Sequence, residues 1–142
     1  MAPIESSNRL TVLLADAPDA GPDWHRTVRG LLEPQGVHTL VARSGREALR
    51  MIESQPVHVA VLDAQMPQLG GLQVVKLMQE LLKADAPPSI LLANQMSSHL
   101  LREALSMHVF TVLGKPVDFN QLLDALARVL RRFHESRWPN EG

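Results

Sequence analysis

The stretch HVAVLDAQMPQLGG, residues 58–71, places a carboxylate, Asp63, at the end of a short apolar run. The run at 57–62 has the length and the branched side chains of a strand that is buried on both faces. Met66–Pro67 then interrupts the pattern, and Gly70–Gly71 precede a helical one. This order predicts that Asp63 lies at the mouth of a loop, where functional side chains are common.

The alternation of strand and helix extends along the chain. Short apolar runs predict strands at 10–15, 38–42, 57–62, 89–93 and 109–113. Helical spacing predicts helices at 24–33, 45–54, 71–83, 98–107 and 119–134. Ser44 with Glu47 forms a capping-box pattern, and Ser97 and Asp118 are good N-caps. The helix predicted at 71–83 has apolar residues at helical spacing, which we interpret as core residues. They are Leu72, Val75, Leu77, Met78, Leu81 and Leu82. Alternating strands and helices predict an α/β fold with a doubly wound parallel sheet.

Length and composition fit one globular domain and exclude several classes of function. The 142 residues are 45% hydrophobic and 20% charged, with a net charge of −1, so no basic field favours nucleic acid. The absence of cysteine excludes disulfides, thiolate metal sites and cysteine nucleophiles. Without a signal peptide or a long apolar run, no membrane contact is expected, and the expected location is cytoplasmic. The expected domain is 10–134, between a flexible lead at 1–9 and a tail at 135–142.

The informative residues are those that follow each strand, because a doubly wound sheet binds ligands at the carboxyl ends of its strands. They are Asp16, Ser44, Asp63, Ala93–Asn94 and Lys115. With strand order 2-1-3-4-5, Asp16 and Asp63 should face each other, and a divalent cation such as Mg²⁺ would relieve their repulsion. Lys115 could pair with a carboxylate or neutralise a phosphoryl group, toward which a carboxylate is a competent nucleophile.

Plainer interpretations stand beside these. A carboxylate at a strand end is often only a helix cap, and the six histidines share no metal-ligand spacing. No glycine-rich nucleotide loop and no G-x-S-x-G nucleophile elbow is present. Trp138 could pack on the fold or lie in an interface, and the sequence leaves that choice open.

Three segments together resemble the receiver domain of two-component response regulators. They are VLLAD at 12–16, VAVLDAQMPQLGG at 59–71 and VLGKP at 112–116, and the resemblance spans about residues 10–134. It implies a flavodoxin-like sheet of five strands in the order 2-1-3-4-5. It also implies a regulatory phosphoacceptor rather than an enzyme, which receives a phosphoryl group from a histidine kinase or a phosphotransfer protein.

The resemblance also implies roles for individual residues. Asp63 matches the phosphoacceptor, and Lys115 matches the lysine that contacts the phosphoryl oxygens. Asp16 matches the first of two adjacent acidic residues that hold Mg²⁺ together with Asp63. Gln65 would supply its backbone carbonyl to the same metal. The Lys115–Pro116 peptide bond is often cis in the family.

The sequence departs from the family at three of its functional positions. Ala17 replaces the second acidic residue, which should weaken Mg²⁺ binding. Ala93 replaces the Thr or Ser whose hydroxyl bonds the phosphoryl group, and Val112 replaces the aromatic switch residue. Asp19 or Asp23, in a lengthened first loop, could substitute as a metal ligand.

Two functions therefore stay open, with a third behind them. The chain is a phosphoaccepting receiver, or it is a pseudo-receiver that binds proteins independently of phosphorylation. Effectors or a second copy would dock on the face formed by the fourth helix, fifth strand and fifth helix. A flavodoxin-like ligand binder or an unrelated α/β enzyme is the third alternative. Whether the chain acts alone or belongs to a larger regulator or hybrid kinase stays open.

Overall fold

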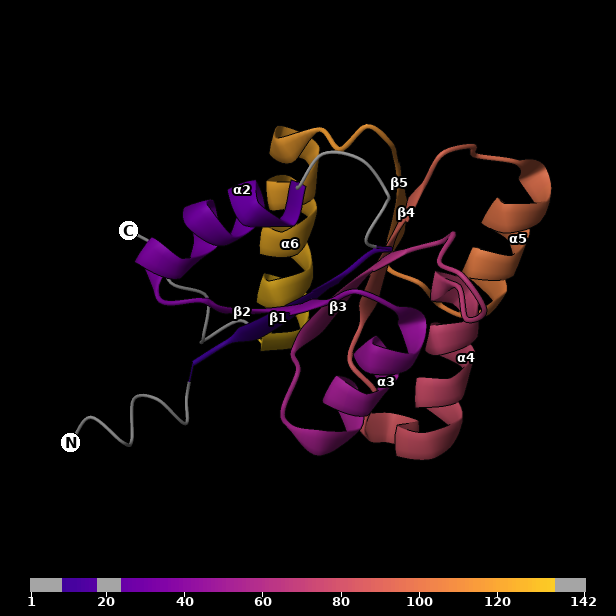
Figure 1. Ribbon diagram of the computed structural model, residues 1–142, viewed down its shortest axis with the longest axis horizontal. Helices are drawn as coiled ribbons and strands as arrows, with labels where there is room; N and C mark the ends of the chain where they lie inside the picture. Colours follow the sequence, from indigo (N-terminus) through magenta and orange to yellow (C-terminus); the bar gives the residue numbers. More distant parts are fainter. Residues whose placement is uncertain (1–8, 18–23, 135–142) are drawn as a thin grey trace.

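The computed structural model describes residues 9–17 and 24–134, which form a five-stranded parallel sheet (Figure 1). The strands are β1 (Thr11–Ala15), β2 (His38–Ala42), β3 (Val59–Asp63), β4 (Ser89–Ala93) and β5 (Thr111–Gly114). Their order is β2-β1-β3-β4-β5, which confirms the predicted fold class and strand order. The third strand includes Asp63 itself, so the side chain of Asp63 starts from a hydrogen-bonded strand.

Helices cover both faces of the sheet. They are α2 (Trp24–Leu32), α3 (Gly45–Ser54), α4 (Gly71–Leu82), α5 (Ser98–Ser106) and α6 (Phe119–His134). Figure 1 shows α2 and α6 on one face and α3, α4 and α5 on the other. Three helices end one residue before their predicted limits. Short 3₁₀ turns at Glu33–Gln35 and Lys83–Asp85 take over after α2 and α4.

Alternate residues of the central strands supply two separate cores. Val12 and Leu14 of β1 point to the core under α2 and α6, whereas Leu13 and Ala15 point to the core under α3, α4 and α5. Every residue of β1, β3 and β4 is buried, and this explains their nearly continuous apolar sequences. β2 lies at the edge of the sheet and is only partly buried.

The predicted helix starts are confirmed. The Ser44 hydroxyl accepts from the Glu47 N–H at 3.0 Å, and the Ser97 hydroxyl accepts from the Leu100 N–H at 3.1 Å. The Asp118 carboxylate accepts from the Gln121 N–H at 3.2 Å. These caps fix the angles at which α3, α5 and α6 leave the strand ends.

Gly70–Gly71 are needed for space rather than for unusual backbone angles. Gly70 has φ −78°, which any residue adopts. A Cβ at Gly71 would lie 2.7 Å from the Asp63 carbonyl oxygen, and a Cβ at Gly70 would lie 2.6 Å from the Ala64 carbonyl oxygen. The start of α4 is therefore packed directly against the end of β3, and this contact holds the acceptor loop in place.

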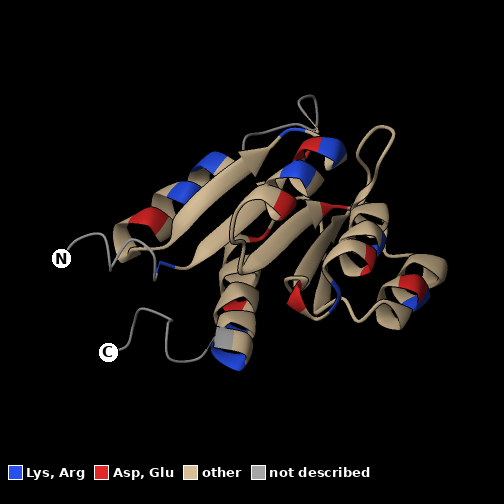
Figure 2. Ribbon diagram, turned by 90° about the horizontal axis from the view of Figure 1, so that it is seen from below, with Lys and Arg blue, Asp and Glu red and all other residues tan. Residues whose placement is uncertain are grey.

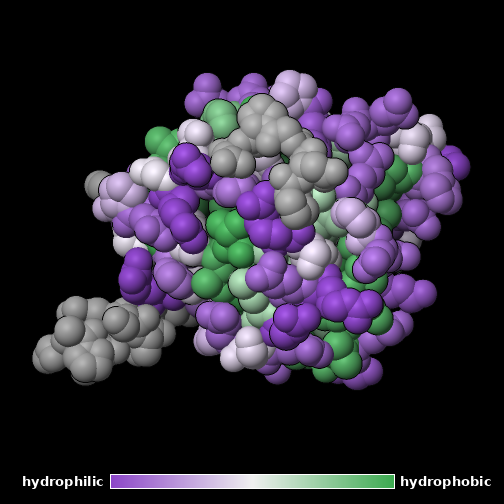
Figure 3. All heavy atoms as spheres, in the orientation of Figure 1, coloured by the Kyte–Doolittle hydropathy of each residue, from purple (hydrophilic) through white to green (hydrophobic). Residues whose placement is uncertain are grey.

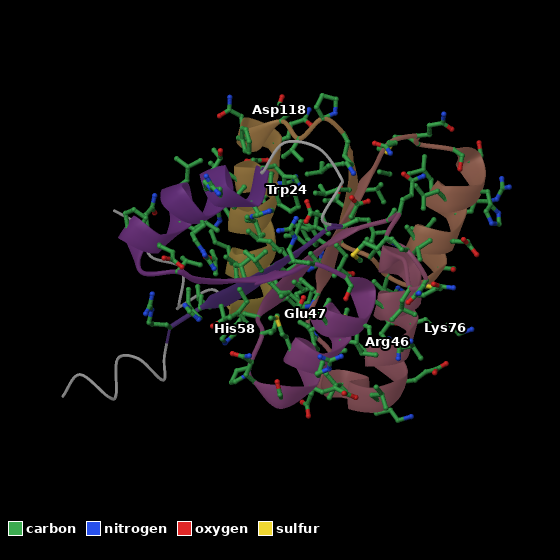
Figure 4. All side chains as sticks on the ribbon, in the orientation of Figure 1. Trp24, Arg46, Glu47, His58, Lys76 and Asp118 are labelled. Atoms are coloured by element: carbon green, nitrogen blue, oxygen red, sulfur yellow. The ribbon has the colours of Figure 1, made fainter. Side chains whose placement is uncertain are left out.

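The surface carries charges of both signs. Figure 2 shows Lys and Arg beside Asp and Glu on several helices. Figure 3 shows small hydrophobic patches among hydrophilic residues on the face that it presents. His58 has a structural role at the amino end of the sheet, where its Nδ1 accepts from the Thr11 N–H at 2.9 Å (Figure 4). In the part of the chain that the structure describes, no helix is long and apolar enough to cross a membrane.

Candidate functional site

A cavity of about 500 Å³ opens at the carboxyl ends of the strands. It lies beside β1, β3, β4 and β5, at the edge where strand order predicts a ligand site. Its lining residues are Ala17, Asp63, Gln65, Met66, Pro67, Asn94 and Lys115. Three predicted site residues, Asp63, Gln65 and Lys115, therefore line the same cavity.

Asp63 lies in the wall of this cavity with both carboxylate oxygens engaged. Its side chain is 1% exposed, and Lys115 Nζ donates to Oδ2 at 2.6 Å. The Gln65 N–H donates to Oδ1 at 2.8 Å. A buried carboxylate needs such partners, because removing it from water without them is costly. The pair places a potential nucleophile and a cation at one point, where the Lys115–Pro116 peptide bond is cis.

Asn94 joins the acceptor loop to the end of β4. Its Nδ2 donates to the Gln65 side-chain carbonyl at 2.7 Å, across the mouth of the cavity. The sequence places Asn94 among the strand-end residues but assigns it no role. The sequence feature that could have pointed to Asn94 is its position as a polar residue directly after a buried strand.

Asp16 lies at the same edge of the sheet but does not line the cavity. Its side chain is 4% exposed, and its Oδ1 lies 3.7 Å from Arg43 Nε. Burial raises the pKa of the Asp16 carboxyl; the nearby charges of His25 and Arg43 and the Trp24 side chain oppose that rise, and Asp63 adds a small increase. The sequence gives Arg43 no role, because it reads only as the residue before the Ser44 cap.

The three positions that depart from the family carry no polar side chain into the site. Ala17 lines the cavity directly. Ala93 is 1% exposed at the end of β4, where its carbonyl accepts from the Lys115 N–H at 2.9 Å. Val112 is half-buried in β5 and packs against the core under α3, α4 and α5. A hydroxyl and an aromatic ring are thus absent where a switch would use them.

The cavity is lined by one carboxylate residue among the described residues. Among the described residues no group of three or more His, Cys, Asp or Glu could hold a metal ion. Asp63 and Gln65 line the cavity, and Mg²⁺ can be held by one carboxylate with waters and a phosphate. Asp19 and Asp23, the predicted substitute ligands, lie outside the described residues.

Comparison with known proteins gives a consistent picture. The family model of the response regulator receiver domain matches residues 18–127. An uncharacterised 14.6 kDa protein of Leptolyngbya boryana is 30% identical over 74% of this chain and 80% of that relative. The positive alginate biosynthesis regulatory protein of Pseudomonas aeruginosa is 30% identical over 86% of this chain. The chain spans only 48% of the length of that regulator.

Solved structures agree with the sequence matches. The signal receiver domain of an HD domain-containing protein from Pseudomonas fluorescens has a TM-score of 0.77 and 25% identity, and the match covers 89% of this chain and 98% of that domain. The receiver domain of the Francisella response regulator 1452 has a TM-score of 0.75 and 27% identity, over 87% of this chain and 98% of that domain. With the carboxylate, lysine and strand order described above, these matches lead to one assignment. The chain belongs to the response regulator receiver domain family.

Proposed function

We propose that this receiver domain accepts a phosphoryl group on Asp63 from a histidine kinase or a phosphotransfer protein and signals through protein contacts. The observation that carries the proposal is the 2.6 Å contact between Lys115 Nζ and Asp63 Oδ2 in the wall of an open cavity. It supports a nucleophile and a charge-neutralising group within reach of the same phosphorus atom. We propose residues 10–134 as the domain and a cytoplasmic location.

The proposed transfer is a displacement at phosphorus. A carboxylate oxygen of Asp63 forms a bond to the phosphorus of a phosphohistidine while the phosphorus–nitrogen bond breaks. The bonding electron pair leaves with the imidazole nitrogen, which takes up a proton from water. Lys115 moves its ammonium group from the carboxylate to the phosphoryl oxygens and neutralises their charge. The Gln65 N–H keeps the carboxylate oriented through Oδ1.

Receiver domains generally bind Mg²⁺ at their acidic pocket. When it is bound, the cation neutralises phosphoryl oxygens beside the acceptor. We propose that Asp63 and the Gln65 carbonyl hold it here and that Asp16 adds little. Binding is weak because Ala17 supplies no carboxylate to the cavity.

A small phosphodonor tests the proposal directly. Incubation with phosphoramidate and saturating Mg²⁺ should add the mass of one phosphoryl group, measured on the intact protein. Asp63→Asn should remove the adduct, whereas Asp85→Asn, at an exposed residue of the turn after α4, should keep it. A wild-type protein without adduct at every Mg²⁺ concentration would contradict the proposal.

A phosphorylation-independent binding module is the second candidate. Ala17, Ala93 and Val112 favour it, because Ala17 lacks a carboxylate for the metal, and Ala93 and Val112 lack the hydroxyl and the aromatic ring through which a phosphoryl signal would spread. The docking face would be α5, β5 and α6, where Leu101 and Leu105 are exposed. A groove of about 360 Å³ on this face is lined by Met96, Val112, Leu113, Gly114, Gln121, Asp124 and Arg128.

The two candidates differ in how binding responds to phosphorylation. An effector or a second copy of this chain would bind equally before and after phosphodonor treatment if the second candidate is right. The same measurement on Asp63→Asn separates phosphorylation from other effects of the donor. Binding that changes with treatment in the wild type alone would exclude the second candidate.

A further inference from the structure

Two buried carboxylates at the carboxyl edge of the sheet, Asp63 and Asp16, each lie close to a cation among the described residues. Asp63 pairs with Lys115 at 2.6 Å, and Asp16 lies 3.7 Å from Arg43. Two negative and two positive formal charges sum to zero. These two pairs therefore leave little net formal charge of their own to attract a metal ion.

Backbone contacts place Arg43 beside Asp16. The Asp16 N–H donates to the Ala42 carbonyl at 3.2 Å, so the chain leaves β1 next to the end of β2. The Arg43 N–H donates to Glu47 Oε1 at 2.8 Å, which ties Arg43 to the first turn of α3. Figure 4 labels Glu47 on α3 and Trp24 at the start of α2. Arg43 is thus positioned by the fold and not only by its own side-chain contact.

The Asp16 carboxyl is buried beside the cavity, and its Oδ1 has no hydrogen-bond partner among the described residues. Ala17, the next residue, lines the cavity, whereas Asp16 does not. The charged groups around Asp16 are Arg43, His25 and Asp63, and the Trp24 indole also lies close. In this arrangement the Asp16 carboxylate forms an ion pair at 3.7 Å with Arg43, whose side chain is partly exposed, while the neighbouring residue that lines the cavity, Ala17, carries only a methyl group.

We infer that Arg43 is an internal counter-cation that holds Asp16 out of the metal site and weakens divalent-cation binding. Mg²⁺ would have to compete with Arg43 for one carboxylate and with Lys115 for the other. The inference adds to the proposed function but does not rest on it, because it concerns metal affinity before phosphorylation. Two features would then weaken Mg²⁺ binding. One is the presence of Arg43 beside Asp16, and the other is the absence of an acidic side chain at Ala17.

Direct metal titration tests this role. Mn²⁺ binding is followed by electron paramagnetic resonance, and Mg²⁺ binding is followed by Trp24 fluorescence in a Trp138→Phe background. Arg43→Gln should tighten both cations about tenfold, since one positive charge near the site is removed. Arg43→Lys keeps the charge and should keep the weak binding. Arg46→Gln, at an exposed residue of α3, should leave the affinity unchanged.

The variant Ala17→Asp separates the effect of Arg43 on metal affinity from the effect of the missing acidic side chain at position 17. Ala17→Asp should tighten binding by itself, and combining it with Arg43→Gln should tighten binding further. Thermal melts of each variant verify that it is folded. Equal affinity of Arg43→Gln and wild type would overturn the inference, as would equal weakening by Arg43→Lys and Arg43→Gln. These results do not depend on phosphoryl transfer, so failure of the inference is distinguishable from failure of the proposed function.

Discussion

At the scale of single residues, the acceptor site depends on a buried ion pair. Lys115 is 12% exposed and Asp63 is 1% exposed. The pair contributes little to stability when intact, because burying both charges offsets much of their attraction. Breaking it is costly, since the remaining carboxylate stays buried and loses a charged donor.

Lys115→Met should therefore destabilise the fold. We expect a loss of about 1–3 kcal/mol in the free energy of unfolding, because Asp63 would keep only the Gln65 N–H as a donor. Urea unfolding at neutral pH measures this loss. Lys76→Met, at an exposed residue of α4 (Figure 4), is the matched control and should change stability by less than about 0.5 kcal/mol. Equal free energies of unfolding for the two variants would show that Lys115 and Asp63 do not form this ion pair in solution.

The sequence alone was enough to predict those residues of this site that are marked by the pattern around them. Asp63 and Lys115 each follow an apolar run, so the pattern of strands was enough to bring them to one edge. Arg43 was missed because its role depends on the register in which Ala15 pairs with Ala42. Asn94 was placed correctly without a role, since its bond to Gln65 depends on side-chain rotamers that no pattern encodes.

At the scale of elements, the close contact between β3 and α4 positions the acceptor loop. Gly71→Ala should destabilise the fold by about 1–3 kcal/mol, because the new methyl group would overlap the Asp63 carbonyl and the Leu91 side chain. Gly30→Ala, in the exposed middle of α2 with no atom within 4 Å of the new Cβ, should stabilise it by about 0.5–1 kcal/mol. Thermal melts followed by circular dichroism compare the two. The same sign of change in both variants would contradict the packing argument.

A second element contact predicts a dependence on pH. Glu33 accepts from the Thr39 hydroxyl at 2.7 Å, and this bond is the main cause that lowers its pKa below 4.5. A lowered pKa in the folded state means that the ionised group stabilises the fold above pH 4.5. That contribution disappears as the pH falls through the lower folded-state pKa. It connects the turn after α2 to edge strand β2.

Glu33→Gln should consequently melt at a lower temperature than wild type at pH 7, and the two curves should converge well below pH 4.5. Melting temperatures across this range give the comparison. Glu53→Gln, at an exposed residue of α3, serves as the control for a general loss of one negative charge. A difference that persists unchanged at low pH would show that the effect is not due to ionisation of Glu33.

Element boundaries were predicted where capping residues mark them and were less accurate elsewhere. Ser44, Ser97 and Asp118 fixed three helix starts. The predicted strands at 57–62 and 109–113 began too early, because Val57 and Val109 pack against the core before the ladder of the sheet begins. Leu81 was predicted as core and is 53% exposed, whereas Val74 is fully buried.

At the scale of the whole molecule, an intact acceptor site is joined to a reduced switch. Phosphorylation can move α5 and β5 only through contacts that differ between the two states. Ala93 has no hydroxyl to follow a phosphoryl group, and Val112 is too small for the rotamer change of an aromatic ring. Among the described residues, the Ala64 N–H donates to the Leu92 carbonyl of β4, and the side chains of Gln65 and Asn94 join the loop after β3 to the residue after β4.

We therefore expect the response to phosphorylation to stay local. In ¹⁵N-labelled protein treated with a small phosphodonor and saturating Mg²⁺, amide shifts should be confined to the loops after β3, β4 and β5. Ala93→Thr restores a hydroxyl at the end of β4, and in this variant the shifts should extend into α5 and its exposed Leu105. Asp63→Asn controls for effects of the donor. Shifts that reach α5 and β5 in the wild type would contradict this expectation and would show that the signal spreads without a hydroxyl at Ala93 or an aromatic ring at Val112.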